Sequence, residues 1–175
     1  MQMPTSALIV RVPEAEPLVE TLRRRFDPSA RLGVPAHITI LFPFMDPGSI
    51  TSDVLAATQA AVGSIRAFAF ALDEVGRWPD TTYLAPRPAE PFVELTEALV
   101  RRFPECPPYG ARHPRIVPHL TVADGSFDAA ETAAAELRPL LRERGAVEAK
   151  CRAIDLIENS SGAWKTMHVI ALSPD

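Results

Sequence analysis

The sequence predicts an α+β protein built mainly on antiparallel β-sheet. Short apolar runs rich in β-branched residues alternate with longer segments whose apolar residues recur at helical spacing. Strand-like runs also follow each other directly within residues 67–85 and 147–172, and the short turns between them favour antiparallel pairing. With 47% hydrophobic and 23% charged residues, the 175-residue chain can bury a core, and we expect one domain over residues 1–175.

Strands and helices alternate in the first half of the chain. Strands are predicted where apolar residues run together or alternate: Ser6–Val12, Ala36–Phe42, Ala67–Val75 and Thr81–Pro86. Helices are predicted where apolar residues fall on one helical face: Leu18–Phe26 and Ile50–Ile65. Asp46-Pro47-Gly48 and Trp78-Pro79-Asp80 have turn composition.

The second half is predicted to contain two further helices, Phe92–Phe103 and Phe127–Arg144. Between them, Cys106–Arg115 has too many helix and strand breakers for regular structure and is expected to be a loop. Val147–Ile157 and Trp164–Leu172 are predicted to be the two strands of a hairpin.

Composition excludes several functional classes. A net charge of −4 and a pI of about 5.6 argue against a surface that holds long nucleic acid by neutralising phosphates, whereas a short or small phosphorylated ligand is compatible with this charge. Cys106 and Cys151 form neither a disulfide framework nor a Cys-x-x-Cys pair. No signal peptide or membrane-spanning run is visible, so we expect a cytoplasmic protein without membrane contact.

Two short motifs carry the chemistry of the chain. VPAHITILFPF holds His37 and Thr39, and VPHLTVAD holds His119 and Thr121 in the same relation. Successive side chains of a strand point to opposite faces, so each motif strand has one polar face and one apolar face. The repeated pattern indicates one feature used twice.

A pair of such motifs suits cleavage of a phosphodiester if the two strands face each other. Imidazole titrates near neutrality, so one histidine can accept a proton while the other donates one. Hydroxyl groups at matching positions can donate hydrogen bonds to the non-bridging oxygens of a phosphate. The sequence therefore predicts acid-base chemistry on a phosphate without a metal ion.

On these residues the sequence resembles the 2H phosphoesterases, a family that includes bacterial 2′-5′ RNA ligase-like proteins and 2′,3′-cyclic nucleotide phosphodiesterases. The resemblance implies two pseudo-twofold-related lobes, each a mostly antiparallel sheet with helices packed on the outside, and an active groove between the sheets. It implies that His37 and His119 are the acid-base pair and that Thr39 and Thr121 bind phosphate. It also implies that no metal is needed, and we expect no other cofactor.

Further substrate contacts are predicted from the same resemblance. Members of the family often place an aromatic side chain beside the groove to stack a base, which makes Tyr83 and Trp164 candidates, with core or rim packing as the alternative. Many relatives have a basic residue after the second motif where this chain has Asp124, and Arg115 is the nearest substitute.

The leading hypothesis is a hydrolase that cleaves a 2′,3′-cyclic phosphate or a 2′-5′ phosphodiester, with a nucleotide, a short RNA or an RNA end as substrate. A non-catalytic module that binds a phosphorylated nucleotide or RNA end is the alternative from another class. A zinc site that combines the motif histidines with His113 and His168 is a third reading, although their spacing does not preorganise ligands. No Gly-x-Ser-x-Gly or Gly-x-x-x-x-Gly-Lys motif supports a serine hydrolase or an ATP-driven ligase, and no sequence signal indicates an oligomer.

Overall fold

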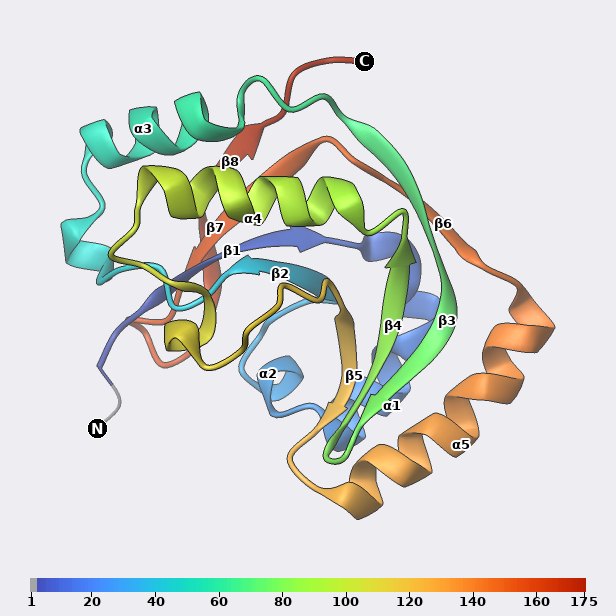
Figure 1. Cartoon of the computed structure of the whole chain (residues 1–175). Helices are drawn as coiled ribbons and strands as arrows, with labels where there is room; N and C mark the ends of the chain where they lie inside the picture. Colours follow the sequence, from blue (N-terminus) through green and yellow to red (C-terminus); the bar gives the residue numbers. More distant parts are fainter. Residues whose placement is uncertain (1–2) are drawn as a thin grey trace.

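A computed structural model of the chain describes residues 3–175, and over this range its strands form one eight-stranded sheet (Figure 1). The strands are β1 (Ser6–Arg11), β2 (His37–Leu41), β3 (Phe68–Trp78), β4 (Thr81–Arg87), β5 (Leu120–Asp124), β6 (Val147–Cys151), β7 (Ala153–Glu158) and β8 (Lys165–Ala171). Their order in the sheet is β6-β3-β4-β5-β2-β1-β7-β8, with antiparallel pairing between neighbours. The predicted α+β class is confirmed.

The two motif strands lie side by side at the centre of this sheet. On one side of the central seam the order is β2-β1-β7-β8, and on the other it is β5-β4-β3-β6. Each half therefore begins with one motif strand and continues outward through three more strands, as a pseudo-twofold relation requires. The halves join where Ile38 of β2 pairs with Leu120 of β5, so the two lobes share a continuous sheet.

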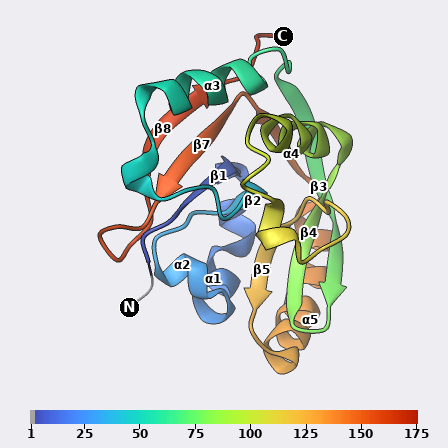
Figure 2. The same cartoon turned by 60° about the vertical axis from the view of Figure 1, so that its left-hand side comes forward.

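The helices form two groups, with α3 and α4 at the top and α1 and α5 at the bottom of the views in Figure 1 and Figure 2. They are α1 (Glu16–Phe26), α2 (Pro28–Arg31), α3 (Ser52–Val62), α4 (Glu90–Arg102) and α5 (Phe127–Arg144), with short 3-10 segments at Pro13–Ala15, Pro47–Ser49 and Pro108–Ala111. Helices α3 and α4 pack together, as do α1 and α5. Within residues 3–175, no helix combines the length and the apolar character needed to cross a membrane.

The apolar faces of both motif strands belong to one core. Ile38 and Leu120 are fully buried in the same cluster as Leu22 of α1, Leu95 of α4 and Leu137 of α5. Helix α4 is also fixed to β2 by a hydrogen bond of 2.8 Å from Thr96 Oγ1 to the carbonyl of Ile40. Burial of these apolar side chains holds the opposite, polar face of the motif strands in place.

The prediction of one strand over Val147–Ile157 is wrong. The chain leaves the sheet at Arg152, and the segment divides into β6, which pairs with β3, and β7, which pairs with β1. The carbonyl of Arg152 accepts a hydrogen bond of 2.9 Å from the Leu172 amide. Only β7 forms the predicted hairpin with β8, because the chain crosses from one half of the sheet to the other at this break.

Candidate active site

Pairing of the central strands brings the two His-x-Thr motifs onto one face of the sheet. Because Ile38 pairs with Leu120 in antiparallel register, His37 lies beside Thr121 and Thr39 lies beside His119. The four side chains are half-buried and line a single cavity of about 1240 Å³. The structure thus brings together the four residues that the motifs predicted.

Both imidazole rings are held in the same way. His37 Nδ1 donates to the carbonyl of Pro35 at 2.7 Å, and His119 Nδ1 donates to the carbonyl of Val117 at 2.7 Å. A carbonyl can only accept, so these bonds place the proton of a neutral ring on Nδ1. Nε2 of each ring is then left to accept or donate the proton that moves in a reaction.

Burial makes both histidines weaker bases than free imidazole. Burial is the main cause that lowers the pKa of His37 from 6.5 to about 4, and the guanidinium of Arg23 acts in the same direction. The bond to the Pro35 carbonyl and the carboxylate of Asp27 oppose this change. Burial also lowers the pKa of His119, while its carbonyl bond and the Asp124 carboxylate act in the opposite direction. Both rings are therefore mainly neutral at pH 7 in the free chain, and an anion bound beside them would favour the protonated form.

Loop 103–119 and strand β3 complete the walls of the cavity with residues that the motifs do not contain. Tyr109 comes from the loop and lines the cavity with Thr39. Burial raises the pKa of its phenol, and the Thr39 side chain acts in the opposite direction. Trp78 comes from the end of β3, and its ring meets the ring of His119 edge-on at 4.8 Å. The indole is 36% exposed, so part of it is open to the cavity.

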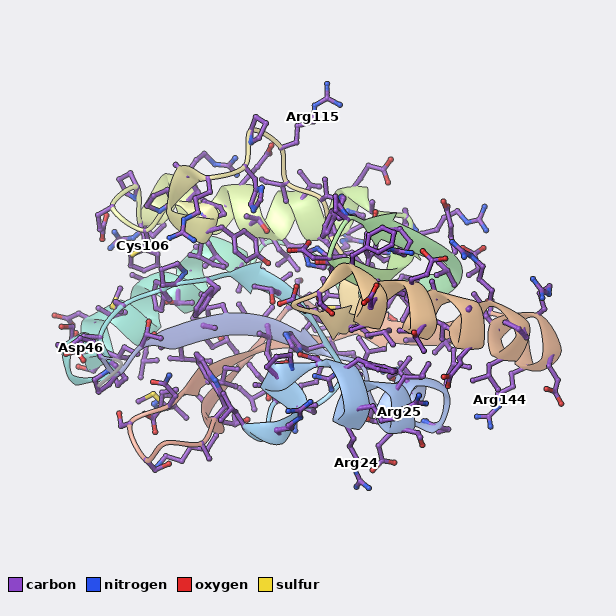
Figure 3. All side chains as sticks on the ribbon, turned by 90° about the horizontal axis from the view of Figure 1, so that it is seen from below. Arg24, Arg25, Asp46, Cys106, Arg115 and Arg144 are labelled. Carbon is purple, nitrogen blue, oxygen red and sulfur yellow. The ribbon has the colours of Figure 1, made fainter. Side chains whose placement is uncertain are left out.

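The three predicted substrate contacts take different positions. Tyr83 lies behind the cavity wall, where its ring packs against Trp78 at 4.4 Å and against His119 at 5.6 Å. Trp164 does not line the cavity, but its ring packs at 6.1 Å against Phe42, which does. Arg115 lies at the rim, and Figure 3 shows its side chain pointing away from the rest of the chain.

Sequence reasoning missed both Trp78 and Tyr109. Trp78 was expected in a turn, but β3 continues to it, and Gly76 lies two positions before it on the same face. A Cβ on Gly76 would lie 2.3 Å from the Tyr83 ring, so this glycine allows Tyr83 to pack beneath Trp78. The two-residue spacing of Gly76 and Trp78 is a strand pattern, so the sequence could have placed Trp78 on β3. The position of Tyr109 could not be predicted in this way, because it depends on how an irregular loop folds.

The remaining histidines are separated. His113 lines the cavity with the motif histidines, and its ring contacts Tyr109 at 5.6 Å, but His168 is exposed on the edge strand β8. Across residues 3–175, no three His, Cys, Asp or Glu side chains are grouped as metal ligands.

Comparison with known proteins gives the family and the fold. The model of the 2′-5′ RNA ligase superfamily matches residues 11–163 of the chain. The crystal structure of Escherichia coli LigT complexed with 3′-AMP is similar at a TM-score of 0.64 and 16% identity, covering 98% of this chain and 99% of that one. The protein TT0787 of Thermus thermophilus is similar at a TM-score of 0.62 and 20% identity, with coverage of 98% and 99%. No curated protein sequence matches the chain.

Proposed function

The chain belongs to the 2′-5′ RNA ligase superfamily, and on this basis we propose that it hydrolyses a 2′,3′-cyclic phosphate or a 2′-5′ phosphodiester of RNA or a nucleotide by acid-base catalysis without a metal. The observation that carries the proposal is the paired geometry of the site. Two complete His-x-Thr dyads share one cavity, and each histidine presents the same ring nitrogen to it. Binding alone needs hydrogen-bond donors, but it does not need two imidazole rings that each leave Nε2 free to exchange a proton.

The proposed reaction is an in-line displacement at phosphorus. One motif histidine accepts a proton from water through Nε2 while the water oxygen bonds to phosphorus. The other histidine donates a proton from Nε2 to the ribose oxygen that leaves. A cyclic phosphate thereby becomes a phosphomonoester with a free neighbouring hydroxyl, and one proton is taken up for each one given.

Thr39 and Thr121 have the complementary task of holding the phosphate. Their hydroxyls can donate to its two non-bridging oxygens, one from each motif strand. The charge of the bound phosphate then raises the pKa of the neighbouring histidines from the low values of the free chain. Substrate binding thus favours the protonated acid that the free chain lacks at neutral pH.

The size and charge of the chain favour a small substrate. Escherichia coli LigT has been crystallised with 3′-AMP, with ATP and with NADP+, which supports nucleotides as the ligand class. A cavity of about 1240 Å³ has room for a nucleotide or the end of a short RNA. The net charge of −4 does not provide the broad cationic face that a long nucleic acid requires.

Hydrolysis of 2′,3′-cyclic AMP and of a 2′-5′-linked diadenylate, each with and without EDTA, tests the proposal. We expect EDTA-resistant turnover that falls by about 10²–10⁴ in His37→Ala and in His119→Ala, the usual contribution of a positioned acid or base. His168→Ala is the matched control, because this histidine is exposed on β8 and should leave the rate unchanged. Nucleotide binding without turnover would instead support the binding module.

A further inference from the structure

Tyr109 is held over the cavity by an unusual backbone. It lies in the left-handed region at φ 50° and ψ 32°, and Gly110 and Ala111 follow with φ 61° each. Residues other than glycine rarely adopt this backbone region, because it costs free energy. The Tyr109 amide donates a hydrogen bond of 2.6 Å to the carbonyl of Phe42, which ties this turn to the end of the first motif strand.

The side chain of Tyr109 joins the first motif at the cavity. Its ring meets Phe42 edge-on at 6.4 Å and His113 at 5.6 Å, which limits its rotation. Tyr109 lines the same cavity as Thr39, whose hydroxyl is one of the two proposed to bind phosphate. Burial raises the pKa of the phenol, and the Asp124 carboxylate adds to this, so the group remains an O–H donor at neutral pH.

We propose that Tyr109 is a further phosphate-binding residue, whose hydroxyl donates to a non-bridging oxygen of the substrate phosphate beside the Thr39 hydroxyl. This inference rests on the proposed function of the same cavity. When a phosphate enters, its oxygens are stronger acceptors than a hydroxyl, so both O–H groups turn toward it.

A neutral donor suits this position because of the charge nearby. Asp124 lines the same cavity as Tyr109 and His119, and its carboxylate raises the pKa of both. Its carboxylate would bind a cationic side chain in competition with the substrate. A phenol hydroxyl donates to the phosphate without being captured as an ion pair.

Binding of inorganic phosphate, measured by isothermal titration calorimetry, tests the proposal without requiring turnover. Tyr109→Phe keeps the ring and removes the donor, and we expect phosphate affinity to fall about tenfold. Thr132→Ala is the matched control, since it removes an exposed hydroxyl from α5 and should bind phosphate like the wild type. The double variant Tyr109→Phe/Thr39→Val should lose less affinity than the product of the two single losses, because the hydroxyls act on the same phosphate.

The melting temperatures of the wild type and Tyr109→Phe distinguish phosphate binding by Tyr109 from a role in packing the loop. If Tyr109 only packs the loop, Tyr109→Phe will bind phosphate as tightly as the wild type, and the inference is wrong. If the wild type hydrolyses substrate and Tyr109→Phe does so at the same rate, this inference is wrong while the proposed function stands. Phosphate binding that weakens in Tyr109→Phe at an unchanged melting temperature supports it, even if no substrate is hydrolysed and the proposed function fails. A wild type that binds no phosphate would contradict both.

Discussion

Ile38 of β2 pairs with Leu120 of β5, and this contact joins the two halves of the sheet. Both side chains are fully buried, and each lies between the histidine and the threonine of its motif. The position of four polar side chains in the cavity therefore depends on two apolar ones on the opposite face. Stability and activity should respond together to changes at this seam.

Shortening a seam residue tests that dependence. Ile38→Ala removes buried apolar volume, and we expect the free energy of unfolding to fall by about 2–5 kcal/mol. Val169→Ala on β8 removes an apolar side chain that is 60% exposed, so it should change stability by less than about 1 kcal/mol. Urea denaturation of the two variants measures the difference, and equal losses would show that the seam is not a critical contact.

Acid should destabilise the fold through His37. The folded-state pKa of about 4 lies below the unfolded value of 6.5, so the unfolded chain binds more protons between these two pH values. Stability is therefore complete above about pH 6.5 and decreases as the pH falls toward 4. Between pH 7 and pH 4.5 the loss amounts to about 2 kcal/mol. His37→Gln should abolish that part of the loss in denaturation experiments, and an unchanged pH dependence would refute the assignment.

Asp124 should support the protonated form of His119. Because its carboxylate raises the pKa of this histidine, Asp124→Asn should lower that pKa in an NMR titration of the ring protons. The Thr81 hydroxyl, 3.0 Å from Asp124 Oδ1, can also donate to an asparagine oxygen, so the local structure should persist. Glu94→Gln on the exposed face of α4 serves as the charge control and should leave the His119 titration where it is. A rise in the His119 pKa in Asp124→Asn would contradict this electrostatic role.

The two tryptophans should report differently on nucleotide binding. Trp78 lines the cavity and contacts His119, whereas Trp164 does not line the cavity. We expect 3′-AMP to quench the fluorescence of the wild type and of Trp164→Phe, because a base beside Trp78 can stack on the indole. The quenching should disappear in Trp78→Phe. The reverse pattern would place the base near Trp164, as the sequence had suggested.

The sequence could predict those parts of the fold that depend on the pattern of neighbouring residues along the chain. Alternation along the strand was enough to identify His37 and Thr39 as the polar face of a buried strand, and the second motif supplied their partners. The break at Arg152 was not predictable, because β6 and β7 have similar strand patterns and differ only in the distant strands with which they pair. Tyr109 was missed for a related reason. Its loop is rich in breakers, so the position of the ring depends on tertiary contacts with Phe42 and His113.

Non-additivity of the two motif histidines is the most direct test of the central claim. We propose measuring hydrolysis of 2′,3′-cyclic AMP in EDTA by His37→Ala, His119→Ala and the double variant. An acid and a base that act in one step lose their effect as a unit, so the double variant should be about as slow as the slower single variant. Losses that multiply in the double variant, or wild-type turnover that EDTA abolishes, would contradict a shared metal-independent site.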